Sequence, residues 1–346
     1  MHFLKKLSFF GKILFWCNSI VAVLLLASFI VPYLAPKQFS SLSLLSLGVS
    51  PLIMLTFLFG VYWLVKLKKQ FIVSAVMLVA AYLIFNPFFK FSSNEKTSSN
   101  ENTISVLSYN VRLFNAYQKN IDTAEISEVL DNTLKIAKPD VVFIQEYYRK
   151  ATQKFLGYPY RYIHFKNKKI GLGYAIFSKY PLINTGSFDF KNTNNNSLYA
   201  DLVKGTDTLR LYNVHLKSLG ITPSVNSLQE QDKEKLFKRI ATTFVRQQEH
   251  TEVILKHMNT TKHPIILAGD FNNTAFSYVY RKLQKGMKDA FIEKGSGLGT
   301  TFKFDSYPMR IDYIFGSKPL EVLKFTSLKQ TFSDHFPIAA VFAIPK

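Results

Sequence analysis

The chain has 346 residues, 48% of them hydrophobic, and a formal net charge of +20. This length suggests roughly two domains. The single Cys17 lies in an apolar segment near the N terminus, which excludes disulfide bonds within residues 91–346. The charge is unevenly distributed, because residues 1–90 contain eight Lys and no Asp or Glu. The first ninety residues therefore form a region of their own.

Three apolar segments without charged side chains fill this first region, at about residues 13–35, 44–65 and 70–89. Each is long enough to cross a hydrocarbon core of about 30 Å as a helix. A cleaved signal peptide is the alternative for the first segment, since lysines precede it. The segment exceeds a typical signal core, however, and two further segments follow. We expect residues 1–90 to form a membrane region with three transmembrane helices.

Lysine placement predicts the orientation of these segments in a membrane. Three lysines precede the first segment and three fill the link between the second and third, whereas the link between the first and second contains only Lys37. Because excess positive charge stays cytoplasmic, we expect a multi-pass protein of the cell (inner) membrane, with everything after Phe89 on the extracytoplasmic side. Residues 91–103, rich in Ser and Asn, are typical of a polar linker to a domain at 104–346.

Residues 104–346 alternate short apolar strands with helical stretches. The expected strands are 104–111, 140–146, 173–182, 197–203, 208–216, 264–272, 310–317, 320–327 and a run from Phe336. A helix with one buried face ends at Pro139, and the longest helix is expected over 228–259. The link between the strands at 197–203 and 208–216 suggests a hairpin. The asparagine-rich patch at 193–197 is expected to be an exposed loop.

Polar side chains recur in or beside these apolar strands: Asn110, Glu146, His215, Asp270, Asn272, Asp312, Asp334 and His335. A single such residue is most often a hydrogen-bonded buried group, but eight would need eight separate explanations. Strand ends that converge on one cleft would account for all eight residues with a single explanation. Carboxylates and amides are hard oxygen ligands, which suit Mg²⁺ or Mn²⁺ rather than zinc. The sequence signatures of zinc sites, serine hydrolases and P-loops are absent from the chain.

Seven segments together resemble the endonuclease/exonuclease/phosphatase superfamily: SYNVRLFN, VVFIQE, GYAIFSKYPL, YNVHLKS, LAGDFNN, RIDYIF and SDHFPI, in this order. The superfamily includes deoxyribonucleases, abasic-site endonucleases, inositol polyphosphate 5-phosphatases and neutral sphingomyelinases. The resemblance covers about residues 103–344 and leaves out the membrane region. It implies that residues 104–346 form an α/β catalytic domain, a four-layer sandwich of two packed mixed β-sheets flanked by helices.

The resemblance also implies a role for each polar residue. Asn110, Glu146 and Asp334 would hold a divalent cation, Mg²⁺ with Mn²⁺ as a possibility. Asp270 would orient or deprotonate the attacking water, and Asn272 would fix that water or a phosphoryl oxygen.

Histidines would act on the phosphate itself. His215 and His335 would hydrogen-bond its non-bridging oxygens, and Asp312 would hold the ring of His335. Tyr174 is either a phosphate contact or a core residue, the latter being the commoner role. His250 matches no motif and is expected at the surface.

The resemblance, together with the apolar segments, implies a membrane-anchored, divalent-metal-dependent phosphoesterase that hydrolyses phosphodiester or phosphomonoester bonds by in-line attack of water. Its substrate stays open between a nucleic acid, a phospholipid and a small phosphate ester. The lipid bilayer is an expected partner of the N-terminal helices, and no protein partner follows from the sequence. The alternative is a non-catalytic membrane-anchored domain of the same fold that binds phosphate-containing ligands. A transporter would need polar residues within the apolar segments, which have almost none.

Overall fold

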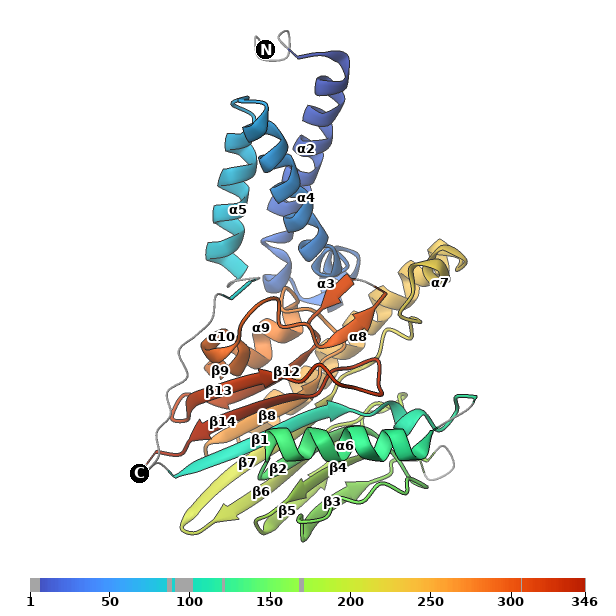
Figure 1. The fold of residues 1–346 in the computed structure, drawn as a ribbon, viewed down its shortest axis with the longest axis vertical. Helices are drawn as coiled ribbons and strands as arrows, with labels where there is room; N and C mark the ends of the chain where they lie inside the picture. Colours follow the sequence, from blue (N-terminus) through green and yellow to red (C-terminus); the bar gives the residue numbers. More distant parts are fainter. Residues whose placement is uncertain are drawn as a thin grey trace.

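The computed structural model describes residues 7–85, 89–90, 102–119, 122–167, 171–305 and 307–345. A bundle of helices stands at one end of an α/β domain (Figure 1). Most of the predicted linker, residues 91–101, lies outside the described residues.

The bundle consists of α2 (Phe9–Ser28), the short 3-10 helix η1 (Val31–Tyr33), α3 (Pro36–Ser43), α4 (Leu45–Val65) and α5 (Phe71–Phe85). By length and composition, two of the described helices, beginning at Phe9 and Pro36, could cross a membrane. They cover the first two predicted segments, although α2 ends before the prolines that close the first one. With 15 residues, α5 is shorter than the roughly 20 that a span needs. Residues 86–88 of the third segment are not described, so three crossings stay a prediction.

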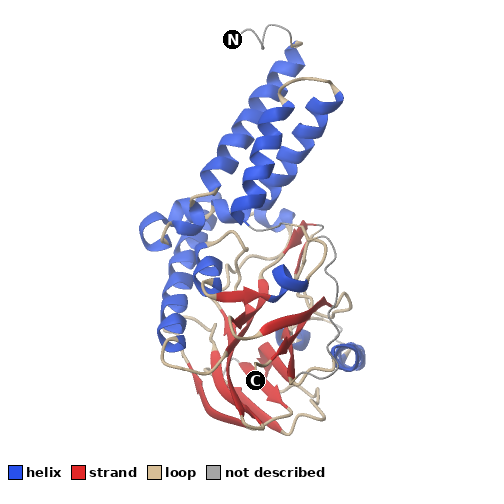
Figure 2. Ribbon diagram, turned by 90° about the vertical axis from the view of Figure 1, so that its left-hand side faces the viewer, coloured by secondary structure: helices blue, strands red, loops and turns tan. Residues whose placement is uncertain are grey.

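Apolar side chains cover the outside of the bundle. Phe9, Val65 and Leu83 are each more than 70% exposed. A polar contact lies inside instead, where the hydroxyl of Ser74 donates to Asn18 Oδ1 at 3.1 Å. An apolar exterior around a polar interior contact suits a lipid environment better than water. Figures 1 and 2 show the start of α2 and the α4–α5 turn at the end of the bundle far from the α/β domain.

Two six-stranded mixed sheets pack face to face in the α/β domain. The first sheet has the order β13-β14-β1-β2-β4-β3 and the second the order β5-β6-β7-β8-β12-β9. The strands of the first sheet are β1 (Thr103–Asn110), β2 (Val141–Tyr148), β3 (Tyr160–His164), β4 (Leu172–Ser178), β13 (Glu321–Ser327) and β14 (Ile338–Ala343). Those of the second are β5 (Leu182–Ser187), β6 (Leu198–Lys204), β7 (Asp207–His215), β8 (Ile265–Asp270), β9 (Met287–Asp289) and β12 (Asp312–Ser317). A separate hairpin pairs β10 (Phe302–Phe304) with β11 (Tyr307–Met309).

The main core lies between the two sheets and includes Val106 and Val141 from the first and Leu211 and Ile266 from the second. Helices cover the outer faces. The apolar face of α6 (Thr123–Ala137) packs on the first sheet, and α8 (Lys233–Met258) and α9 (Tyr278–Gln284) pack on the second. The succession of helix, sheet, sheet and helix confirms the predicted four-layer sandwich. The remaining short helices are η2 (Arg112–Asn115), α7 (Val225–Gln229) and α10 (Ala290–Lys294).

The expected strands are present, and the predicted hairpin joins β6 to β7. The longest helix begins at Lys233 rather than at 228, because the side chain of Asp232 accepts from Lys235 N and caps it there. The sequence did not indicate β3, β5, β9, β10 or β11, since the strand expected at 173–182 ends as β4 and reaches only the first residue of β5. These strands are short, and β3 and β5 are half-buried or exposed, so they lack the apolar run by which a strand is found.

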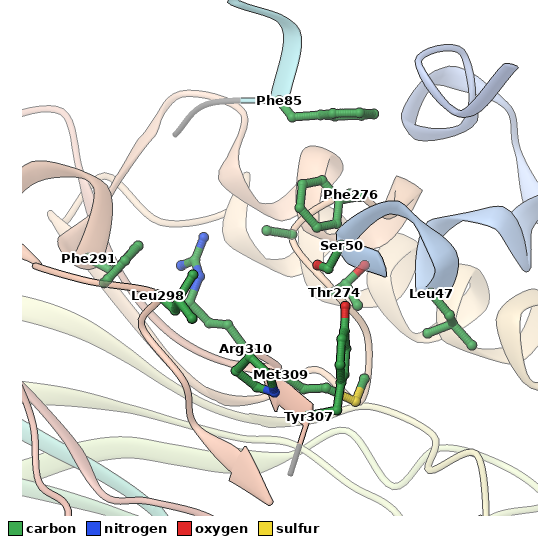
Figure 3. A pocket seen from close by; sticks show the side chains of 12 residues that line it. Leu47, Ser50, Phe85, Thr274, Phe276, Phe291, Leu298, Tyr307, Met309 and Arg310 are labelled. Carbon is green, nitrogen blue, oxygen red and sulfur yellow. The ribbon is translucent and has the colours of Figure 1, made fainter. Parts of the chain in front are cut away.

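The bundle contacts the α/β domain through α3 and the start of α4. The backbone N–H of Lys37 donates to Gln248 Oε1 on α8 at 2.9 Å, and the hydroxyl of Thr274 donates to the carbonyl of Ser46 at 2.8 Å. Side chains from both parts also enclose a small cavity (Figure 3): Leu47, Ser50 and Phe85 from the bundle, and Thr274, Phe276 and Tyr307 from the domain. The bundle therefore reaches the segment that follows Asp270.

Candidate active site

The polar residues singled out in the sequence meet at one edge of the sandwich. Asn110, His215 and Asp270 end β1, β7 and β8, and Glu146 lies near the end of β2. Because β1 and β2 are parallel neighbours, as are β7 and β8, their carboxyl ends point the same way within each sheet. The other four residues lie just after β8, at the start of β12 and just before β14: Asn272, Asp312, Asp334 and His335.

The backbone is irregular at two of these residues. The pairing of β2 with β4 shifts between Ile144 and Tyr147, and Glu146 within this bulge has a φ of 55°. Asn272 has a φ of 50°. Residues other than glycine rarely adopt positive φ, and such strain is concentrated at functional sites. A bulge also re-aims a side chain, which here brings Glu146 Oε1 to within 3.9 Å of His215 Nε2.

Strands β7 and β8 approach each other closely just before Asp270. Gly269 has a φ of 144°, and a Cβ atom at this position would lie 1.9 Å from the carbonyl oxygen of Val214. Only glycine fits such an approach. It places the carboxylate of Asp270 beside His215, with 3.5 Å between Oδ2 and Nε2.

Asp270 is buried at the centre of the site. Its carboxylate accepts from the backbone N–H of Asn272 at 2.7 Å and from the side-chain amides of Asn110 and Asn272 at 3.1 and 3.2 Å. Burial, opposed by the positive charge on His335, raises the pKa of Asp270 to about 7. A carboxyl group that titrates near neutral pH is suited to accept a proton from water.

His335 and Asp312 form a buried pair, with Nδ1 and Oδ2 2.9 Å apart. Burial alone would lower the pKa of His335, but the carboxylates of Asp312 and Asp270 raise it to about 10. The imidazolium therefore keeps a donor on Nε2, which lies 3.7 Å from Asp270 Oδ2. This ring is placed to donate to an anionic group in front of Asp270.

His215, in contrast to His335, favours the neutral form of its imidazole ring. Burial, together with the positive charge of His335, lowers the pKa of His215 to about 3, so its ring is neutral. The side-chain nitrogen of Asn195 lies 3.0 Å from His215 Nε2. The sequence reasoning missed Asn195, because it belongs to the asparagine-rich patch expected to be an exposed loop. The patch is a loop and Asn194 is exposed, but the expected exposure is wrong for Asn195 and Asn196, which are buried and whose amides bind His215 and Ser187.

A second missed group links the two sheets behind the site. Gln145 Nε2 donates to Asn213 Oδ1 at 2.7 Å, and Asn213 Nδ2 donates to the carbonyls of Ile144 and Ala175. These residues stand next to Glu146 and two before His215 in the chain, so the same motifs contain them. Their pairing was not visible from the sequence because it depends on how the sheets face each other.

The burial of Tyr174 and His250 tests the expectations for these two residues. Tyr174 is buried, and its hydroxyl donates to the carbonyl of Asn194 at 2.9 Å, which makes it a core residue. His250 was expected at the surface, and this is wrong. It is buried and stacks on Phe190, with ring centroids 3.9 Å apart. Its face of α8 packs on the second sheet, which its polar character did not indicate.

Glu146 and Asp334 are the half-exposed carboxylates of the site. Burial raises the pKa of Glu146 and the charge of Asp334 raises it further, although His335 opposes both. A cation beside the two carboxylates would offset this cost. Because the donors are all oxygen atoms, the pair fits a hard divalent cation such as Mg²⁺. The side-chain amide nitrogen of Asn110 lies 3.5 Å from Glu146 Oε1. For Asn110 to bind the cation through its oxygen, the amide group would have to be flipped, so a role for Asn110 as a direct ligand stays a prediction.

Another group of possible ligands, Asp270, Asp312 and His335, has its ligand atoms within 4.8 Å of one another. Two of its members are already joined by the hydrogen bond between His335 Nδ1 and Asp312. A cation at this group would have to displace a proton from the His335 imidazolium, whose pKa is raised to about 10, because a metal ligand must be deprotonated. The chemistry of the donors therefore favours Glu146 and Asp334 for the cation.

A cavity of about 750 Å³ opens in front of these residues. Six of the eight line it: Asn110, Glu146, Asp270, Asn272, Asp334 and His335. His215 and Asp312 are not among its described lining residues, and they contact Asp270 and His335 from behind. The cavity thus gives a ligand access to the carboxylates and to the protonated imidazole together.

Residues 107–335, more than half of the chain, match the model of the endonuclease/exonuclease/phosphatase family. The chain belongs to this family. Its members are hydrolases that act on phosphate esters, generally with a divalent metal. Residues 11–88 match the model of a domain of unknown function, DUF8431. No curated protein matches the chain.

Solved structures share the fold of the family domain. A humanized TDP2 from D. rerio with 14 mutations is 19% identical, with a TM-score of 0.53 over 69% of this chain and 98% of that one. TDP2 from D. rerio in complex with a single-strand DNA product is 19% identical, with a TM-score of 0.52 over 70% and 99% of the two chains. The human Nocturnin catalytic domain with bound sulfate is 18% identical, with a TM-score of 0.51 over 71% and 99%. At these identities the likeness establishes the fold alone.

Proposed function

We propose that this family member is a membrane-anchored phosphoesterase that uses a divalent cation, Mg²⁺ or Mn²⁺, to hydrolyse a phosphate ester by in-line attack of water. The convergence of the eight polar residues at one edge of the sandwich, six of them lining one cavity, carries the proposal. Two accessible carboxylates, a buried carboxyl group with a pKa near neutral and a protonated imidazole are the groups that this reaction needs.

Asp270 would take a proton from the attacking water, and the amides of Asn110 and Asn272 would keep its carboxylate in place. The bond between the water oxygen and phosphorus forms, the ester bond to the leaving oxygen breaks, and the leaving alkoxide takes up a proton from solvent. His335, held by Asp312, would donate to a non-bridging oxygen, where negative charge grows in the transition state.

His215 would add a second, neutral donor to the phosphate, or hold Asp270 from behind, where it lies in this structure. Glu146 and Asp334 would hold the cation, with Asn110 beside them. When bound, the cation would supply neutralisation of the phosphate charge and polarisation of the leaving oxygen.

The bundle would anchor the enzyme in the cell membrane with the α/β domain on the extracytoplasmic side. The lysines of the α4–α5 turn and Lys12 lie at the end of the bundle far from the domain, which supports this orientation under the positive-inside rule. A reporter that is active only after export, fused after Lys346, should be active. Activity of a cytoplasm-only reporter at the same junction would overturn the orientation.

Hydrolysis of bis-p-nitrophenyl phosphate by the purified full-length protein in detergent tests the reaction itself. We expect turnover with Mg²⁺ or Mn²⁺, its loss on addition of EDTA, and its recovery when the cation is restored. The absence of turnover of this ester and of a panel of oligonucleotides, phospholipids and inositol phosphates would favour a non-catalytic binding domain instead.

A further inference from the structure

The cavity in front of the candidate active site extends well beyond the polar residues. From Asp270 and His335 it continues along apolar side chains of the segment after β7 and of the β10–β11 hairpin, among them Leu219, Ile221, Leu228 and Phe304. These side chains are half-buried, and they line the cavity. A polar site therefore opens into an apolar groove.

The far wall of this groove belongs to the helix bundle. Leu47 and Pro51, in the first two turns of α4, line the same cavity as Asp270. Hydrogen bonding of Thr274 to Ser46 fixes the start of α4 against the segment that follows Asp270. Because α4 is long and apolar enough to cross a membrane, the groove is continuous with a surface that lipid chains would touch.

The surroundings of the groove also fit a position at a membrane surface. Figure 1 shows α7 at the height where the bundle meets the domain. In this short helix, Val225 is exposed and Leu228 faces the cavity. Apolar side chains at this level would lie against the lipid rather than in water.

Charge in the cavity argues against a nucleic acid. Arg112 is the sole Lys or Arg among the described residues that line it, although the chain carries 43 such residues. Proteins that hold a single strand need a row of cationic side chains along its phosphates and aromatic rings for its bases. Here the walls that lead away from the site are mainly aliphatic, so a second and third phosphate would meet no cation.

We propose that the groove binds an acyl chain of a membrane phospholipid, so that the substrate of the site is a phospholipid whose phosphate ester reaches Glu146, Asp270 and His335. This inference rests on the proposed phosphoesterase function and names its substrate class. The volume of about 750 Å³ is within the range of about 300–1,000 Å³ of small-molecule sites. The lipid would enter laterally beside α4, and only its phosphate would leave the apolar surroundings.

Full-length protein in vesicles of phosphatidylethanolamine and phosphatidylglycerol, doped with phosphatidic acid or sphingomyelin, tests the inference. Release of phosphate or phosphocholine is compared with turnover of the soluble bis-p-nitrophenyl phosphate. We expect Ile221→Asp and Leu228→Asp each to lower the ratio of lipid turnover to soluble-ester turnover at least tenfold, because a charge in the groove repels the acyl chain. Val253→Asp, at an exposed position on α8 away from the cavity, should leave the ratio unchanged.

An unchanged ratio in both groove variants would overturn the inference. Cleavage of an oligonucleotide by a protein that hydrolyses no phospholipid would do the same. Either result leaves the phosphoesterase itself intact, whereas a protein that hydrolyses neither lipid nor bis-p-nitrophenyl phosphate contradicts the proposed function.

A binding measurement keeps the groove testable without turnover. Phosphatidic acid with a diazirine on its acyl chain is incorporated into the same vesicles, irradiated with the full-length protein, and the labelled peptides are identified. We expect labels within residues 218–228, 302–305 and 307–309, and their loss in Ile221→Asp. Labelling confined to α2, α4 and α5 would show that lipid chains surround the bundle but do not enter the groove, and would overturn the inference.

Discussion

The two sheets contribute different halves of the candidate active site. The first sheet and the loop before β14 supply Glu146 and Asp334, whose side chains are 27% and 19% exposed. The second sheet supplies Asp270 and Asp312, whose side chains are 1% and 3% exposed. An accessible carboxylate can take up a cation from solvent, whereas burial raises the pKa of Asp270 to about 7, so that this group can exchange a proton near neutral pH. Under the proposed function, exposure would therefore separate the groups that bind the cation from the group that accepts a proton.

His335 joins these halves. It follows Asp334 in the chain and so comes from the first half, but its ring binds Asp312 of the second sheet. Its position depends on both sheets being packed, and its charge depends on carboxylates from the second. The predictions below test this division, from the largest expected effect to the smallest.

Asp270→Asn removes the proposed proton acceptor and keeps its shape. We expect kcat for bis-p-nitrophenyl phosphate to fall about 10⁴-fold, the upper end of the contribution of a general base. Burial raises the pKa of Asp270 from an ordinary value of 3.8 to about 7, so its ionisation destabilises the fold progressively between these pH values, and the cost is complete at pH 8. The melting temperature at pH 8 should therefore not fall. Asp131→Asn, exposed on α6, is the matched control. Near-normal turnover with a much lower melting temperature would make Asp270 a structural residue.

His335→Ala removes the donor that connects the two halves. We expect a loss of about 10³-fold in kcat, as for a donor to the transition state. KM should change little, because other contacts bind the ground state. His263→Ala, exposed before β8, serves as control. If His335 were only a core histidine, turnover per folded molecule would persist and the melting temperature would drop steeply.

Glu146→Gln tests the cation-binding half. The Mg²⁺ concentration for half-maximal rate should rise about 100-fold, since loss of even a supporting group costs 10- to 100-fold in metal affinity. Glu128→Gln on the exposed face of α6 should leave it unchanged. An unaltered Mg²⁺ titration in Glu146→Gln would move the cation to Asp270, Asp312 and His335 and so break the division.

Asp312 is a positioning residue in this scheme, because it acts through the ring of His335. Asp312→Asn should lower kcat about tenfold, as for other groups that orient a functional side chain. In the His335→Ala background the same change should have almost no further effect. Additive losses in the double variant would mean that Asp312 acts independently of His335.

Thr274→Val tests whether the helix bundle supports the half of the site that the second sheet supplies. It removes the hydrogen bond to Ser46 with little change in shape, so the free energy of unfolding should fall by about 1 kcal/mol. We expect kcat to stay close to that of the parent protein. A large loss of kcat without loss of folded protein would show that the bundle positions the segment after Asp270.

The sandwich was predictable because its central strands carry long apolar runs. Strands such as β2 and β8 are buried over most of their length, which leaves a continuous apolar run that leads directly to the polar residues of the site. Short edge strands such as β9 and the β10–β11 hairpin carry no such signal. The boundary of α8 was missed by several residues because Asp232, rather than the apolar pattern, decides where the helix begins.

Residue types by themselves indicated a hard cation at the site, because carboxylates and amides recur at the ends of apolar strands. The phosphate came from the resemblance of seven short segments to the family, which is also read from the sequence alone. Charge-free segments of sufficient length likewise indicated the membrane region. These inferences hold because side-chain chemistry and strand periodicity are local properties of the chain.

Tertiary structure alone decided the charge state of each group and the shape of the cavity. His215 and His335 are the same residue type, yet burial leaves the first neutral, and carboxylates from distant strands keep the second protonated. Asn195 reached His215, and Leu47 of α4 reached the cavity of Asp270, only through folding. Burial and neighbouring charges set a pKa, and packing of distant segments sets a cavity, so neither is encoded in any short stretch of sequence.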